Sequence, residues 1–123
     1  MTMTKNYAKN KDAEMTKWGA LTSQLSTNSY VDIGAPDILD VSLFRTKAIR
    51  FTATTNNLLV NVLGSLDGGV TFDQTVEADI SVTTAAVVAK TYTAPYTHLK
   101  VQVKAASGGS QGTLATKYFC SWL

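Results

Sequence analysis

The sequence predicts an all-β fold, an antiparallel β-sandwich of the jelly-roll kind with an extended N-terminal arm. Threonine supplies much of the polarity, and this β-branched residue favours pleated strands while remaining uncharged. Several short segments alternate apolar and polar residues, as half-buried strands do. Turn residues rather than helices separate these segments, which favours antiparallel sheets over a parallel α/β fold. About eight strands are expected, and a closed barrel is the main alternative.

The clearest strand is residues 98–105, where Leu99, Val101 and Val103 alternate with lysine and glutamine. The clearest hairpin follows residues 58–65, because Asp67-Gly68-Gly69 supplies the positive φ angles that tight turns require. The expected strands cover residues 29–34, 37–44, 47–54, 58–65, 70–76, 80–82, 85–92, 98–105 and 113–122.

Residues 1–12 are polar and lack apolar periodicity, which is typical of an arm. The next segment spaces Met15, Trp18, Leu21 and Leu25 as one face of a helix would, after Asp12 as an N-cap. We therefore predict a short amphipathic helix in the arm, which orders when Trp18 is buried. The expected organisation is an arm over residues 1–28 and one sandwich domain over residues 29–123. Removal of residues 1–25 is expected to leave the sandwich folded.

Charge is scarce in this 123-residue chain. Charged residues make up 16% of it, against an average of about 25%, so part of the surface is expected to be buried against a partner. The net charge of +2 is too small to imply nucleic-acid binding. Seven of the nine acids lie between Asp32 and Asp79, and none follows Asp79. The two halves of the chain would then present faces of opposite sign and steer association, although scattered solubilising charge explains the same pattern.

Cys120 is the only cysteine, which excludes an internal disulfide and a cysteine-based metal site. Its apolar flanks predict a buried, inert thiol. The N-terminal residues lack the apolar stretch of a signal peptide, and no segment has the length of a membrane span. We expect synthesis in a cytoplasm and no membrane partner.

No residue pattern indicates catalysis. His98 is the only histidine, and no nucleophile or orienting carboxylate is marked beside it. Asp73, Glu77 and Asp79 are close enough in the sequence to bind a hard cation together, but the loop motif that usually builds such a site is absent. We therefore interpret them as solvated carboxylates. The glycines of residues 64–69 belong to turns and not to a phosphate loop. We expect neither enzymatic activity, nor a cofactor, nor a bound metal.

The segments Val62–Phe72 and Tyr96–Val103 resemble small virion proteins of tailed bacteriophages. Those proteins have a strand, a Gly-Ser-x-Asp-Gly-Gly turn, an aromatic residue and a return strand, and later a Tyr-x-x-Leu-x-Val strand. The resemblance covers roughly residues 45–122 and implies no catalytic residues. It implies a capsid decoration protein or another structural protein of the head or tail.

The expected function is therefore that of a decoration or cement protein in the virion, made in the host cytoplasm. Its expected partners are the major capsid protein or other virion proteins, with further copies of itself in a small symmetric oligomer such as a trimer. The predicted interface residues are Lys5, Tyr7, Lys9, Met15, Trp18 and Leu21. Two alternatives remain: a tail or baseplate protein, and a carbohydrate-binding or host-recognition module that uses Tyr92, Tyr96 and residues 108–112.

Overall fold

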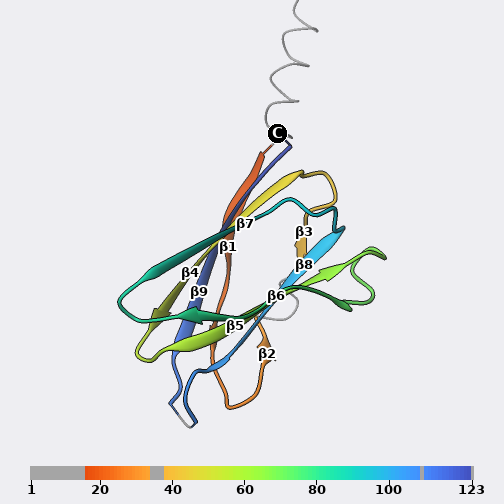
Figure 1. The fold of residues 1–123 in the computed structure, drawn as a ribbon. Coiled ribbons are helices and arrows are strands. Elements are labelled where there is room, and N and C mark those ends of the chain that lie inside the picture. The colour runs from red at the N-terminus through yellow and green to blue at the C-terminus, as the bar shows by residue number, and fades with distance from the viewer. Residues whose placement is uncertain (1–15, 34–37, 109, 123) are drawn as a thin grey trace, which may run out of the picture.

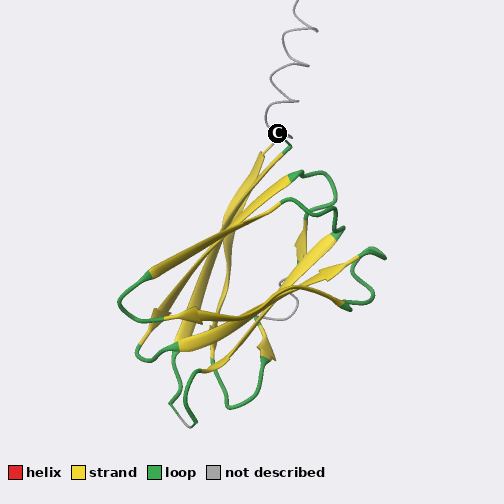
Figure 2. Ribbon diagram, viewed as in Figure 1, coloured by secondary structure: helices red, strands yellow, loops and turns green. Residues whose placement is uncertain are grey.

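Two antiparallel β-sheets pack face to face, as Figure 1 shows. The structure is a computed structural model that describes residues 16–33, 38–108 and 110–122. Sheet A has the order β1 (Thr16–Leu25), β9 (Thr113–Ser121), β4 (Thr46–Thr54) and β7 (Val87–Tyr92). Sheet B has the order β2 (Val31–Asp32), β8 (His98–Ala105), β5 (Leu58–Ser65) and β6 (Gln74–Val82), and β3 (Leu39–Asp40) also pairs with β8. The described residues contain no helix (Figure 2). The predicted all-β sandwich is confirmed, and its two separate sheets exclude the closed barrel.

The core lies between the sheets and follows the predicted alternation. On β4, Ile49 and Phe51 point inward, and on β8 Leu99, Val101 and Val103 do the same. Because successive side chains of a strand point to opposite faces, each strand contributes every second residue to this layer. The sandwich therefore rests on the period of two that the sequence displays.

The predicted helix is wrong over residues 16–25, which form strand β1 and pair with β9. Trp18 and Leu21 would share one face of a helix, but an odd spacing places them on opposite faces of a strand. Trp18 is exposed, whereas Leu21 packs against the core. Gly19 also suits the strand, because a Cβ there would come within 2.9 Å of the Tyr118 hydroxyl. Asp12 and Met15 lie outside the described residues.

The β5–β6 hairpin is confirmed, but its loop is longer than a two-residue turn. The return strand begins at Gln74 and continues through the separate strand predicted at residues 80–82. Gly68 and Gly69 have the expected positive φ angles, of 79° and 89°. The Asp67 carboxylate accepts a hydrogen bond from the Thr71 amide at 2.9 Å and one from the Ser65 hydroxyl at 2.7 Å. These bonds stabilise the ionised form and lower the pKa of Asp67 to about 2.

Lys47 on β4 is fully buried at one end of the core. Its ammonium group donates to the Ala94 carbonyl at 2.5 Å and to the Arg45 carbonyl at 3.5 Å. Its neighbour across the ladder is Cys120, which is buried as predicted. Burial lowers the pKa of Lys47 and raises the pKa of the Cys120 thiol, because both charged forms lose hydration.

Replacement of Gly64 by alanine is predicted to destabilise the fold by about 1–3 kcal/mol, the usual cost of overpacking. A Cβ at this buried position would lie 2.5 Å from the Tyr96 ring. Urea unfolding should show most of this loss disappearing when Gly64→Ala is made in a Tyr96→Ala background. The matched control is Gly108→Ala, since a Cβ there has nothing within 4 Å. Equal losses at the two glycines would contradict the packing argument.

The buried Lys47 ammonium predicts a pH-dependent stability. The pKa is lower in the folded state than in the unfolded state, so the cost of burying the charge is fully present at low pH. This cost is relieved as the pH rises through the folded-state pKa. Relative to Lys47→Met, the wild-type free energy of unfolding should rise between pH 7 and about 9.5, below the titration of unfolded tyrosine and lysine. The exposed Lys117→Met is the control, and a flat wild-type minus Lys47→Met difference would refute the prediction.

Candidate functional site

The structure sorts the charged residues by sheet. The four strands of sheet A carry five cations and no acid. The strands of sheet B carry four acids and two lysines. Charge is therefore divided between the sheets and not between the sequence halves as predicted, because β4 brings Lys47 and Arg50 from the acidic half into sheet A. Opposite sides of the sandwich differ in charge, and such a difference orients association.

The outer face of sheet A presents an exposed aromatic pair. Trp18 on β1 lies directly across from Phe119 on β9, and Ala48 on β4 follows in the same row. Trp18 is 76% exposed and Phe119 is 49% exposed. Cross-strand aromatic neighbours form a contiguous surface, in contrast to a single exposed side chain. This pair therefore forms an exposed aromatic patch on sheet A.

Two cations lie beside the aromatic pair. Arg50 on β4 pairs in register with Lys117 on β9, two residues along from Ala48 and Phe119. Both cations are exposed. The other cations of sheet A point elsewhere: Lys90 binds Glu77 at 3.0 Å, and Lys17 donates to the Asp40 carbonyl at 3.2 Å. Trp18, Phe119, Arg50 and Lys117 define what we call the aromatic-cationic face.

Small residues leave a shallow hollow in this face. Ala48 and Ala89 flank Arg50 on β4 and β7 and, with Lys117 and Phe119, line a depression of about 290 Å³. The short alanine side chains form the floor of this hollow, and the longer side chains around them form its walls. The arrangement suits an apolar side chain from a partner, with the two cations at the rim.

The structure places only part of the predicted interface set. Lys5, Tyr7, Lys9 and Met15 lie outside the described residues, so their predicted role is not tested. Trp18 and Leu21 are described, and the structure separates them: Trp18 lies on the outer face, whereas Leu21 packs against the core.

Phe119, Arg50 and Lys117 were not among the interface residues predicted from the sequence. Alternation in residues 113–121 was sufficient to place Phe119 and Lys117 on one face of a strand. What the sequence did not indicate is that β9 lies between β1 and β4, since those pairings join segments far apart in the chain.

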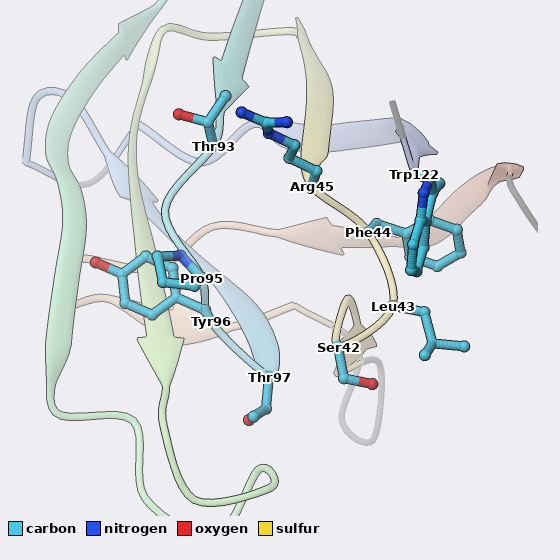
Figure 3. Close-up of a pocket in the computed structure, with 9 residues that line it drawn as sticks. All are labelled: Ser42, Leu43, Phe44, Arg45, Thr93, Pro95, Tyr96, Thr97 and Trp122. Carbon is cyan, nitrogen blue, oxygen red and sulfur yellow. The ribbon is translucent and has the colours of Figure 1, made fainter.

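A second depression, of about 460 Å³, lies at the end of the sandwich where β1 begins and β9 ends. Figure 3 shows Phe44, Leu43 and Trp122 on one side of it and Pro95 with Tyr96 on the other. Polar groups complete its lining: Ser42, Arg45, Thr93 and Thr97. Aromatic walls with scattered hydroxyls and one guanidinium suit a polar organic ligand with an apolar face.

The residues predicted for a sugar site do not come together. Tyr96 lines the end pocket, but Gly108 and residues 110–112 lie beyond the opposite end of β8, and Gly109 lies outside the described residues. At about 3.3 Å per residue, the eight residues of β8 separate the two by more than 20 Å. Tyr92 is half-buried, and its hydroxyl donates to Glu77 at 2.9 Å. Burial, and after it this hydrogen bond, raises the pKa of Tyr92.

The three acids of β6 and its preceding loop take separate partners. Glu77 is held by Lys90 and Tyr92, whereas Asp79 accepts a hydrogen bond from Tyr30. Asp73 accepts one from Gln74 at 3.1 Å. Within the described residues, no three histidine, cysteine or carboxylate side chains form a metal-binding group.

His98 lies at the start of β8. Its Nδ1 is 3.1 Å from the Thr97 hydroxyl, and its Nε2 is 3.9 Å from the nearer Asp40 oxygen. The described part of the chain also contains no helix long and apolar enough to cross a membrane.

Known proteins resemble this chain in fold alone. No protein-family model and no curated protein matches the sequence. The fold is similar to a chain of the Bacillus endospore appendages, which form disulfide-linked pili, with a TM-score of 0.51, 15% identity and 88% of each chain covered. It is also similar to a chain of infectious bursal disease virus, Gx strain, with a TM-score of 0.53 and 12% identity over 85% of this chain and 31% of the viral one.

A carbohydrate-binding module of Cellvibrio mixtus lichenase 5A, solved with cellotriose, has a TM-score of only 0.40 at 12% identity, over 85% of this chain and 86% of that one. That likeness supports no argument about function. At the identities of the pilus and viral chains, the similarity concerns the β-sandwich, on which many unrelated functions are built. This chain therefore shares a sandwich architecture with proteins that build pili and with a virus protein.

Proposed function

We propose that this protein is a non-enzymatic structural protein of a phage virion, a decoration or cement protein that binds the assembled shell. The observation that carries the proposal is the exposed Trp18–Phe119 pair on the acid-free strands of sheet A. The resemblance of residues 45–122 to small phage virion proteins supports the same assignment.

The aromatic pair has the properties of an interface centre. Tryptophan and arginine are enriched among residues that dominate binding energies, and Trp18 has Arg50 and Lys117 in the neighbouring row. An exposed tryptophan in a sheet gains most of its hydrophobic free energy only when a partner covers it. A neighbouring subunit with an apolar centre and acidic rim fits this face.

The mechanism of stabilisation is linkage. A protein that binds the assembled shell and not its separate subunits shifts the equilibrium toward assembly by its binding free energy. No reaction and no cofactor is required. The partner that fits the proposal is the major capsid protein or another virion protein, contacted across subunit junctions.

A test of the predicted arm requires a shorter truncation than the removal of residues 1–25 that the sequence suggested. Residues 16–25 form β1, so removal of residues 1–25 would expose the edge of β9 and uncover part of the core. Removal of residues 1–15 tests the arm without disturbing the described strands. We propose that Lys5, Tyr7, Lys9 and Met15 add contacts to the shell beyond those of Trp18.

Replacement of Trp18 by serine is predicted to weaken attachment to phage heads about 30-fold or more, the loss typical of an interface tryptophan. Heads of the cognate phage assembled without this protein would be titrated with it, and co-sedimentation would measure binding. Leu43→Ser, another exposed apolar residue, is the control and should bind normally. Wild-type affinity for Trp18→Ser would refute the role of this face. Wild-type affinity after removal of residues 1–15 would refute the role of the arm.

A second candidate function is carbohydrate or host recognition, and the end pocket is the observation that favours it. Trp122 and Phe44 offer apolar surfaces, while Arg45 and the hydroxyls of Ser42 and Thr93 offer hydrogen bonds. This proposal replaces the dispersed set of Tyr92, Tyr96 and residues 108–112 with one connected pocket. A tail or baseplate location would use the same aromatic-cationic face and would be distinguished by immunogold labelling of virions.

The carbohydrate proposal predicts that a glycan array gives specific signals and that Arg45→Ala and Trp122→Ala remove them. Both side chains line the pocket, so the loss would follow from missing stacking and hydrogen bonds. Trp18→Ser is the control, because Trp18 lies on the outer face of sheet A. An array with no signal for the wild type would dismiss this second function.

A further inference from the structure

We infer that a second copy of this chain occupies the aromatic-cationic face with the loop of its β5–β6 hairpin, residues 66–73. This inference rests on the proposed assembly role, and it names the surfaces through which the copies meet. The occupant is identified by complementary charge and by apolar exposure on the same short segment.

The hairpin loop exposes apolar side chains within an acidic setting. Val70 is 83% exposed and Leu66 is 59% exposed. Asp67 and Asp73 lie in the same loop, and residues 66–73 contain no lysine or arginine. Lys100 lies near its base, 4.7 Å above the Phe72 ring, and also pairs with Asp32 at 3.4 Å. The loop is an apolar projection with negative charge around it.

The aromatic-cationic face offers the opposite properties. Its shallow hollow, floored by Ala48 and Ala89, has room for a branched apolar side chain such as Val70. Trp18 and Phe119 extend the apolar surface, and Arg50 with Lys117 would face the hairpin acids. Buried pairs of this kind orient a contact and exclude partners of the wrong charge.

The hairpin is held in shape before it binds. The Ser65 hydroxyl accepts from the amides of Asp67 and Gly69, while the Asp67 carboxylate accepts from Thr71. A loop already fixed by its own hydrogen bonds loses little conformational entropy on docking. The exposed side chain of Val70 remains available to a partner, and among the described residues the exposed Asp73 carboxylate contacts only the Gln74 amide, at 3.1 Å.

The two surfaces lie on different sides of the molecule, so one copy cannot satisfy its own contact. Figure 1 shows the β5–β6 hairpin projecting away from the strands of sheet A. A contact between two different surfaces of identical subunits is head-to-tail, and it repeats until a ring closes or a filament grows. The small symmetric oligomer expected of the protein is the closed form of this arrangement.

The test uses two full-length variants, each with one surface altered. The face variant carries Trp18→Ser with Lys117→Glu, and the hairpin variant carries Val70→Ser with Asp73→Lys. All four side chains are exposed, and circular dichroism with thermal unfolding would verify the fold. Leu43→Ser serves as the control. Sedimentation velocity would be measured up to about 1 mM, which detects even weak association.

The wild type and Leu43→Ser should associate, and each double variant alone should associate at least about tenfold more weakly. An equimolar mixture of the two variants should form a dimer and stop there, because it contains one intact face and one intact hairpin. A monomeric wild type would overturn the inference. So would a mixture that stays monomeric, or a hairpin variant that associates like the wild type.

Failure here is distinct from failure of the proposed function. If the wild type binds phage heads but remains monomeric in solution and makes no contact with neighbouring copies on the shell, only the hairpin contact is overturned. Conversely, a wild type that self-associates as described but ignores the heads overturns the decoration role and leaves this contact in place.

Discussion

The position of β9 between β1 and β4 is the constraint on which the rest of the structure depends. Its register with β1 places Phe119 across from Trp18, and its register with β4 places Lys117 across from Arg50. Because side chains alternate, the same two ladders point Leu114 and Cys120 into the core. A slip of one residue would exchange these faces. The core and the proposed interface are therefore specified by one set of backbone hydrogen bonds.

The division of charge between the sheets gives the sandwich a direction. Sheet A contributes cations without acids, whereas most acids lie on sheet B and on the hairpin between β5 and β6. In the proposed contact, this charge distribution disfavours an approach of sheet A to sheet A and favours one of the hairpin to sheet A. A chain with few charges can therefore still have sheets that differ in charge. The few charges present are concentrated where they discriminate between orientations.

Local structure shapes both surfaces of the proposed contact. The hairpin is held by the hydrogen bonds of Ser65 and Asp67, and Ala48 and Ala89 line the shallow hollow in the outer face of sheet A. The end of the core is closed differently, by the buried ammonium of Lys47 bonded to backbone carbonyls. A buried cation bonded to backbone carbonyls contributes little net stability, although here it binds the Ala94 carbonyl in the segment beside the end pocket.

The sequence by itself determined the sandwich class, the inward residues of β4 and β8, the hairpin after Ser65 and the burial of Cys120, because these follow from alternation and local turn chemistry. It misassigned residues 16–25, since Trp18, Leu21 and Leu25 satisfy helical spacing by coincidence and a strand in this place depends on a distant partner. The neighbours of β9, the sorting of charge by sheet and the pairing of Trp18 with Phe119 were decided by tertiary structure alone. Pairings between segments almost a hundred residues apart are set by how whole strands pack together, which no local pattern records.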